Sequence, residues 1–530
     1  MAPIFVGSNS DDSRVRSNRV GFAVSTANPG SAAEGDVYFN STDNKLRAYD
    51  GSDWANIGAG GGTFSGIASG TLSNGQTVII QTDGTVTGVA TTSQSLGSAT
   101  VFESANTTYT GATFDSVNNK VVIAYNDAGN SYYGTAVVGT VTGTGITFGT
   151  PVVFETGNTE YSSAVYDSTN GKVVIAYRDG GNSDYGTAVV GTVSGDSISF
   201  GTPVVFESAA SRWVSAAYDS NNGKVVIAYR DEGNSNHGTA IVGTVSGTSI
   251  SFGSAVVFKT TDTRECSVVY DSSNEKIVIA YSDYGSSQYG KAIVGTVSGT
   301  SISFGSNTVF ESARSEFISA TYDSSNEKVV IAYQDGGNSD AGTAVVGTVS
   351  GTSISFGTPV AFESTNAYTT AVVYDSNAGK VVIPYKDSGN SNYGTLVVGT
   401  VSGTSISFGS AAIYESAATD NISSTFDSTN NKVVIAYRDE GNSNYGTSIV
   451  FRNESTNLKS TNFLGFSDAA YTNGQTATVQ IVGSVDDAQT GLTTGSRHFV
   501  QNNGTLSTTA GSPSVLAGTA ISATKIIIRK

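Results

Sequence analysis

Apolar and β-branched residues in the central part of this chain come in short blocks separated by turn-forming residues. The stretch 148–199 holds four such blocks of seven to ten residues, rich in Val, Ile, Tyr and Thr: 148–156, 162–168, 172–179 and 186–195. Length and composition of this kind are typical of β-strands. Between the blocks lie segments rich in Gly, Asn, Ser and Asp: 168–171, 180–183 and 194–197. The pattern predicts four antiparallel strands joined by hairpin turns.

The same pattern recurs with a period of 52 residues. A Tyr/Phe-Asp-Ser landmark occurs seven times without an insertion, with its acid at Asp115, Asp167, Asp219, Asp271, Asp323, Asp375 and Asp427. A second landmark, Ala/Pro-Tyr-x-Asp, keeps the same step at Asp127, Asp179, Asp231, Asp283, Asp335, Asp387 and Asp439. Four-stranded units repeated radially build β-propellers. We therefore predict an all-β chain with a seven-bladed β-propeller over 96–454; a linear β-solenoid is the rival arrangement.

The two ends of the repeat array favour the ring. Its first element, 96–104, has the sequence of an outer strand, whereas its last unit stops after 446–454 and holds no such strand. An N-terminal strand is therefore expected to complete the last blade, which closes the ring and removes the open edges of a solenoid. Outside the repeat we expect small β-rich domains: a module at 1–62, a β segment or linker at 63–95, and a C-terminal domain at 455–530.

Charge and composition argue against several classes of function. The 530 residues carry 44 acids against 27 Lys and Arg, for a net charge of −17, which argues against nucleic acid as a partner. The single cysteine, Cys266, permits no intramolecular disulfide, and two histidines, His237 and His498, leave little for zinc or His-based catalysis. We therefore expect no cofactor and no metal. The start of the chain lacks the features of a signal peptide and no stretch resembles a spanning helix, so we expect a product made in a cytoplasm, without membrane insertion.

The repeat copies differ most from one another at one end of the predicted propeller. There, the predicted loop from each outer strand to the next inner strand holds the most divergent pairs: Thr108-Tyr109, Glu160-Tyr161, Arg212-Trp213, Arg264-Glu265, Glu316-Phe317, Tyr368-Thr369 and Asp420-Asn421. The neighbouring loop adds variable positions that include Arg178, Arg230, Arg438, Tyr185 and His237. This end therefore gathers aromatic rings and most of the scarce arginines of the propeller.

Rings beside charged and amide side chains suit a sugar or a peptide loop, since rings cover apolar faces and polar groups fix hydroxyls or charges. Loop drift with exposed tyrosines is the alternative explanation. The candidate ligand-binding residues are Tyr109, Tyr161, Arg178, Tyr185, Arg212, Trp213, Arg230, His237, Arg264, Glu265, Phe317, Tyr368 and Arg438. Trp213 with Arg212 is the pair to mutate first, and His237 is expected to make the same contacts as the tyrosines of its column.

Three sets of acids raise the question of other chemistry. The Asp-x-Gly-Asn-Ser loops could offer calcium oxygen ligands, but they carry few carboxylates, and an Asp that caps a hairpin turn explains them better. The Glu of Phe-Glu-Ser occurs in almost every unit, so it is interpreted as architecture. The acids that break the repeat are Glu160, Glu265, Glu316 and Asp420, and a glycoside hydrolase built on them is the less favoured alternative to binding. Cys266 is expected to be a buried thiol.

The flanks resemble modules of tailed-bacteriophage appendage proteins, including those of cyanophages. The resemblance rests on Gly35–Asn40, Asp43–Gly51 and Trp54, on Ser69–Ile80 with Asp83–Val86, and on the C-terminal runs Phe463–Asp468, Gly491–Ser496, Val500-Gln501, Gly504–Ser507 and Gly518–Lys525. It implies a tail-fibre-like virion protein, with flanks that contact other virion proteins or form a homo-oligomer. The propeller would then bind a host surface structure such as a polysaccharide. A structural decoration protein and a polysaccharide depolymerase are the second and third alternatives.

Overall fold

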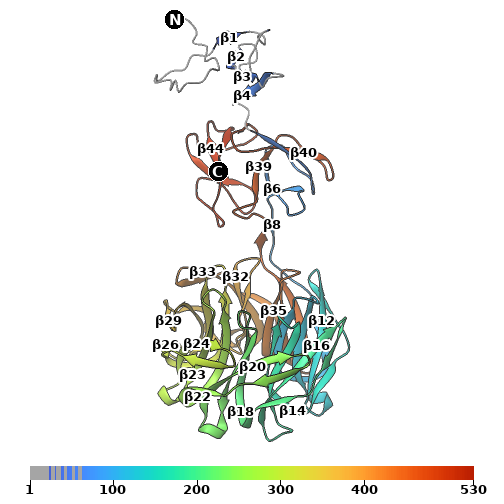
Figure 1. Cartoon of the computed structure of the whole chain (residues 1–530), viewed down its shortest axis with the longest axis vertical. Helices are drawn as coiled ribbons and strands as arrows, with labels where there is room; N and C mark the ends of the chain where they lie inside the picture. The colour runs from blue at the N-terminus through green and yellow to red at the C-terminus, as the bar shows by residue number, and fades with distance from the viewer. Residues whose placement is uncertain are drawn as a thin grey trace. The chain divides into compact units, whose positions relative to one another are not determined.

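The computed structural model describes residues 23–25, 30, 37–40, 45–49, 54–57 and 62–529, and divides the chain into two compact units. One unit is Ser93–Glu454; the other combines Met1–Thr92 with Ser455–Lys530. Within the described residues, no helix is long and apolar enough to cross a membrane. In Figure 1 the strands of the first unit run in colour from β12 in cyan to β35 in orange.

Every blade of the first unit has the same four strands in antiparallel order. In blade 2 the inner strand is the second half of β14 (Val152–Asp167), which pairs with β15 (Lys172–Asp179), which pairs with β16 (Tyr185–Ser194). The outer strand consists of β17 (Ser197–Phe200) and the first half of β18 (Val204–Asp219). Each long strand therefore ends one blade and begins the next.

The pairing repeats seven times, which confirms the predicted β-propeller. The remaining long strands are β10 (Thr100–Asp115), β22 (Val256–Asp271), β26 (Thr308–Asp323), β30 (Val360–Tyr368) with β31 (Val373–Asp375), and β35 (Ala412–Asp427). The remaining second strands are β11 (Lys120–Asp127), β19 (Lys224–Asp231), β23 (Lys276–Asp283), β27 (Lys328–Asp335), β32 (Lys380–Asp387) and β36 (Lys432–Asp439). The remaining third strands are β12 (Tyr133–Thr142), β20 (His237–Ser246), β24 (Tyr289–Ser298), β28 (Ala341–Ser350), β33 (Tyr393–Ser402) and β37 (Tyr445–Arg452). The remaining short outer strands are β13 (Gly145–Phe148), β21 (Ser249–Phe252), β25 (Ser301–Phe304), β29 (Ser353–Phe356) and β34 (Ser405–Phe408).

The ring closes as the ends of the repeat array predict. Strand β9 (Ser95–Leu96) and the start of β10 lie antiparallel to β37, with Leu96 opposite Phe451 and Thr100 opposite Ser448. The N-terminal strand therefore supplies the outer strand of blade 7. Strand β37 is therefore paired on both sides, with β36 and with the N-terminal strand, and is not an exposed sheet edge.

The blades pack face to face through their second and third strands. In β15 all residues from Val173 to Asp179 are buried, because both faces of this strand are covered by neighbouring blades. One apolar cluster joins Val174 and Val190 of blade 2 to Val225 and Ile227 of blade 3. Runs of Val and Ile that are buried on both faces explain why these strands do not alternate between apolar and polar residues.

The repeated acids of both landmarks cap turns, whereas the sequence predicted this role for the second landmark alone. Asp219 is fully buried, and its Oδ1 accepts hydrogen bonds from the backbone N–H groups of Asn221 and Asn222, both at 3.0 Å. At the opposite end of the blade, the acids of the second landmark cap five short 3₁₀ turns: η1 (Ala128–Asn130), η2 (Glu232–Asn234), η3 (Tyr284–Ser286), η4 (Ser388–Asn390) and η5 (Glu440–Asn442).

The second unit interleaves the two flanks, which the sequence analysis had separated at 63–95 and 455–530. Its first sheet has the order β5 (Thr63–Ile67), β40 (Thr476–Gln480), β39 (Phe463–Ser467), β6 (Thr77–Ile80) and β7 (Val86–Gly88). A second sheet runs β41 (Val485–Asp486), β45 (Ile526–Ile528), β44 (Val515–Ala520), β42 (Arg497–Val500) and β43 (Leu506–Ser507), and β38 (Ser455–Thr456) pairs with β8 (Thr91–Thr92). Strands β1 (Ala23–Ser25), β2 (Val37–Asn40), β3 (Lys45–Tyr49) and β4 (Trp54–Ile57) form a separate sheet, and part of the stretch at 35–54 that carries the resemblance lies outside the described residues.

Candidate ligand-binding site

The divergent aromatic positions lie in β-bulges on the inner strands. The prediction of a loop between blades is wrong in six blades, because the long strands β10, β14, β18, β22, β26 and β35 run through these positions without a break. It holds in blade 6, where the chain leaves the sheet between β30 and β31. The pairing register with the second strand shifts there, for example between Thr108 and Gly111. One residue of each bulge adopts a left-handed backbone with φ between 43° and 55°, and these seven residues form what we call the bulge ring: Tyr109, Tyr161, Trp213, Glu265, Phe317, Thr369 and Asn421.

The inner strands of neighbouring blades contact one another directly. The backbone N–H of Ala216 donates to Ser163 Oγ of the preceding blade at 3.1 Å, and Val268 donates to Ser215 at 3.0 Å in the same way. At the bulge ring, the N–H of Tyr109 donates to Asn421 Oδ1 at 2.8 Å, which links blades 1 and 7. Because these strands meet one another around the ring, the bulges bring together side chains that are 52 residues apart in sequence.

Three consecutive blades present a row of aromatic rings, which we call the aromatic arc: Tyr109, Tyr161 and Trp213. The ring centroids of Tyr109 and Tyr161 are 5.0 Å apart, and those of Tyr161 and Trp213 are also 5.0 Å apart. All three side chains are half-buried. Burial raises the pKa of Tyr109 to about 12 and raises the pKa of Tyr161 as well. Farther round the ring, Phe317 and Tyr368 meet edge to face at 5.5 Å.

Arginines flank the aromatic arc, and each one is paired with carboxylates. Arg178 on β15 lies opposite Glu160, binds its carboxylate, and also reaches Asp184 at 2.7 Å. Arg212 lies 2.8 Å from Glu232. A guanidinium beside a carboxylate offers both donors and acceptors to a polar ligand.

The same pairing extends over the whole end of the propeller. The other pairs are Arg230 with Asp262 and Glu232, Arg264 with Asp262, Arg314 with Glu316 and Asp340, Lys386 with Glu440, and Arg438 with Asp420 and Glu440. Seven cations thus meet eight carboxylates. The arginines do gather at one end, as predicted, but they create no uncompensated positive patch among the described residues.

Two of the predicted residues lie farther out. Tyr185 and His237 are the first residues of β16 and β20, the third strands of their blades, and both are half-buried. They are two strands away from the inner strand that carries the bulge. The structure therefore does not bring them into the aromatic arc.

Glu265 is the one acid of the bulge ring. Burial and the nearby charge of Glu316 raise its pKa to about 7, although the backbone N–H of Phe317 hydrogen-bonds to its carboxylate. The adjacent Cys266 is buried in the core beneath Trp213, as predicted, and burial raises the pKa of its thiol. Among the described residues, no group of three or more His, Cys, Asp or Glu side chains converges in a way that could hold a metal ion.

A column of residues in the turn after each second strand also contributes to the site, although none of them was among the predicted site residues. It contributes Glu232 and Glu440 to the ion pairs, and Tyr284, whose ring lies 3.6 Å below the guanidinium carbon of Arg264. Asp262 and Arg314, at the start of this region on the long strands, were also missed. The signal was available, since these columns also differ between the repeat copies.

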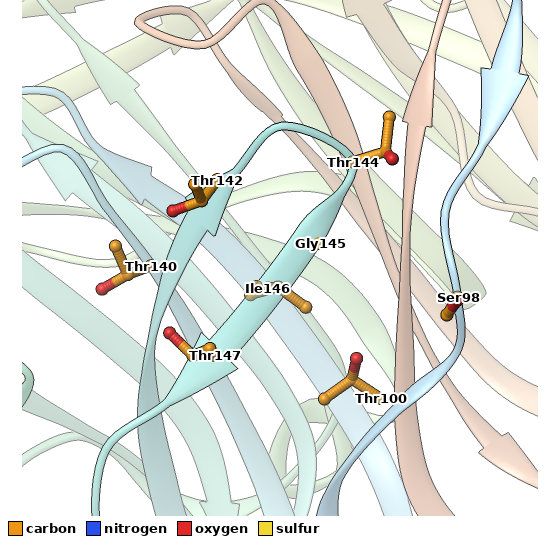
Figure 2. Close-up of a pocket in the computed structure, with 8 residues that line it drawn as sticks. All are labelled: Ser98, Thr100, Thr140, Thr142, Thr144, Gly145, Ile146 and Thr147. Atoms are coloured by element: carbon orange, nitrogen blue, oxygen red, sulfur yellow. The ribbon is translucent and has the colours of Figure 1, made fainter.

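A hydroxyl-lined pocket lies away from the bulge ring, where blade 7 meets blade 1. Its volume is 260 Å³, and Figure 2 shows its walls: the segment from β9 to β10 and the hairpin of β12 and β13. The lining residues are Ser98, Thr100, Thr140, Thr142, Thr144, Gly145, Ile146 and Thr147. It has neither an aromatic ring nor a charged group, so the aromatic arc offers more to a ligand.

Comparisons with known proteins bear on the fold alone. No protein-family model and no curated protein sequence matches this chain. The BP39L lectin from Burkholderia pseudomallei matches in structure with a TM-score of 0.50 at 8% identity, over 67% of this chain and 99% of the lectin. The Cps50 (Swd1) β-propeller domain of Myceliophteria thermophila gives a TM-score of 0.45 at 9% identity, over 68% of this chain and 99% of that domain. At such identities the match to the lectin supports the propeller fold and no more.

Proposed function

We propose that the propeller binds carbohydrate at the aromatic arc. The observation that carries this proposal is the row of half-buried rings of Tyr109, Tyr161 and Trp213 beside the Arg178–Glu160 pair. Ring faces cover the C–H faces of a sugar, while the paired guanidinium and carboxylate meet its hydroxyls. The fold shared with a lectin is consistent with this proposal.

The charge pattern favours a neutral glycan as the ligand. Every arginine at this end of the propeller already lies beside a carboxylate, so a polyanion would have to compete for each guanidinium. A neutral sugar needs no such exchange, because its hydroxyls can bind to the outer edges of pairs that stay intact.

The resemblance of the flanks supports a place for the chain on a virion, as a tail-fibre-like appendage protein that holds the propeller toward a host cell. In this role the ligand is a surface polysaccharide of the host, and weak contacts from several copies add up through multivalency. The unit built from 1–92 and 455–530 would contact other virion proteins or further copies of the chain. A structural decoration protein would instead bind no glycan.

The experiment is a binding assay of the full chain on host cells and on purified host polysaccharide. We expect Trp213→Ala combined with Arg212→Ala to abolish binding. The matched control is Val117→Ala, since Val117 is exposed in the turn after β10, at the opposite end of the blade. Undiminished binding by the double variant would rule out the aromatic arc. Absence of binding by the unaltered chain would favour a decoration protein.

Glu265 favours polysaccharide hydrolysis as a second candidate function. It has no salt bridge among those of the described residues, burial and Glu316 raise its pKa to about 7, and it stands in the bulge ring between Trp213 and Phe317. A carboxylic acid that keeps its proton near neutral pH can act as a general acid. The test is release of new reducing ends from host polysaccharide, with Glu265→Gln as the inactive control. Binding without release supports a non-enzymatic protein.

A further inference from the structure

Six blade interfaces contain the same group of a buried tyrosine, a buried aspartate and a half-buried glutamate. At the interface of blades 1 and 2, the hydroxyl of Tyr177 donates to Glu155 Oε2 at 3.0 Å, and Asp179 follows two residues later on the same face of β15. Glu155 comes from the outer strand of the preceding blade. The same Tyr-to-Glu bond is made by Tyr125, Tyr229, Tyr333, Tyr385 and Tyr437.

Only one of the two carboxylate oxygens of the aspartate in this group accepts a hydrogen bond from the described residues. Oδ1 of Asp179 accepts the N–H of Gly181 at 3.0 Å and so caps the turn, whereas the hydrogen bonds of the described residues leave Oδ2 free. The negative charge of Glu155 lies near enough to contribute, after burial, to raising the pKa of Asp179 to about 6. Two carboxylates that face each other without a cation between them repel each other.

A buried threonine hydroxyl completes the group, and in blades 2 and 3 it has no hydrogen-bond partner. Thr187 lies directly opposite Tyr177 in the pairing of β15 with β16, so its side chain is on the same face as Tyr177 and Asp179. It is 1% exposed, and its Oγ1 has no hydrogen-bond partner. Thr239 of blade 3 is 2% exposed and its Oγ1 is equally unpartnered. At the other four interfaces the equivalent hydroxyl donates to the carbonyl oxygen two residues earlier, at 3.4–3.5 Å, which leaves its lone pairs for a ligand. An unsatisfied buried hydroxyl calls for a ligand or a water molecule.

The seventh interface, between blades 3 and 4, has lysines in place of the glutamate and the threonine, and these indicate the charge of the ligand at the other six. At the interface of blades 3 and 4, Lys259 on the outer strand of blade 3 occupies the column of Glu155, and Lys291 of blade 4 occupies the column of Thr187. Both ammonium groups contact Asp283 Oδ2, at 2.9 Å and 2.7 Å, so they bind the oxygen that is free in Asp179. A lysine reaches one bond farther than a glutamate, so its ammonium stands in the space between a glutamate at this position and the aspartate. The chain itself thus places positive charge at this point.

We propose that each of the other six interfaces binds a hard cation, Ca²⁺, between the Glu and Asp carboxylates, with the Thr hydroxyl as a further oxygen ligand. Two carboxylates and a hydroxyl are oxygen ligands of the kind that Ca²⁺ prefers, and water fills the rest of the shell. The turn sequence alone has too few carboxylates for such a site; the preceding blade supplies the missing one. With so few protein ligands, the expected dissociation constant is about 10⁻⁴–10⁻³ M.

The test is Ca²⁺ uptake by the chelator-treated full chain, measured by equilibrium dialysis at about 1 mM Ca²⁺. We expect six ions per chain. The variant Glu155→Lys with Thr187→Lys copies blade 4 into blade 2 and should bind five; the reverse exchange, Lys259→Glu with Lys291→Thr, should bind seven. Circular dichroism checks that each variant folds. No uptake by the unaltered chain, or the same stoichiometry in both variants, would overturn the proposal. Glycan binding is measured separately, so each proposal can fail alone.

Discussion

The rings of Tyr161 and Trp213 come from neighbouring blades, and their centroids lie 5.0 Å apart with the planes at 60°. The two residues are 52 positions apart in sequence, and what joins them is the bulge that both inner strands carry at the same point. A left-handed backbone at Tyr161 and at Trp213 sets both side chains at equivalent angles. The fold thus turns a repeat in sequence into a continuous aromatic surface, whose chemistry depends on which residue each copy carries.

We expect Tyr161 to contribute through its ring more than through its hydroxyl. Tyr161→Leu should weaken glycan binding about 10-fold, because an aromatic stacking contact contributes about 1.4 kcal/mol. Tyr161→Phe keeps the ring and should weaken binding less than about 3-fold. The measurement is titration calorimetry with the glycan. Equal losses in the two variants would show that the hydroxyl, rather than the ring face, makes the contact.

The fold could be predicted in large part from the sequence because the repeat is strict. Seven copies of two landmarks fix the blade number, and the offset of 96–104 from the last unit predicts the pairing of β9 with β37. The interleaving of the flanks could not be predicted, since β6 and β39 lie about 380 residues apart and neither carries a landmark that identifies its partner.

The sequence predicted which repeat positions form the candidate site, but not how their side chains are arranged in space. Divergence between copies identified Tyr109, Tyr161 and Trp213, yet nothing in the local sequence distinguishes a bulge in a continuous strand from a loop between strands. The ion pairs could not be predicted either, because Arg230 pairs with Asp262 on the outer strand of its own blade, and the sequence does not show that the two side chains meet. The other columns that vary between the copies, including that of Tyr284, also belong to the observed site.

Asp219 should be one of the more sensitive stability positions. Its buried carboxylate caps two backbone N–H groups and accepts the side-chain amide of Asn222 at 2.8 Å, so Asp219→Ala leaves three donors without a partner. We expect a loss of about 2–3 kcal/mol in the free energy of unfolding, measured by urea denaturation. Ser220→Ala, at an exposed position of the same turn, is the control and should change stability by less than about 0.5 kcal/mol. A similar loss in both variants would contradict the capping role.

The raised pKa of Glu265 predicts that the free energy of unfolding depends on pH. Its pKa rises from 4.5 to about 7 on folding. Between these two pH values the native protein therefore keeps the proton that the unfolded chain has released. The contribution of the protonated form is present at low pH and is lost as the pH rises from about 4.5 through 7. Glu265→Gln removes this loss: it should match the unaltered chain at pH 4 and be more stable at pH 8 by at least about 1 kcal/mol. Denaturant titrations at both pH values measure this, and parallel curves would contradict the raised pKa.

The propeller should fold without its flanks, provided that its ring can close. The fragment 93–454 contains β9 and all of β10, so each blade keeps four strands, and we expect it to show a cooperative thermal transition and to bind the same glycan as the full chain. The matched fragment 107–454 lacks the outer strand of blade 7 and exposes the edge of β37. Its transition, followed by circular dichroism, should lie at least about 5 °C lower, and light scattering should reveal association through the open edge. If both fragments melt at the same temperature and stay monomeric, the N-terminal strand is dispensable and ring closure does not explain the stability of the propeller.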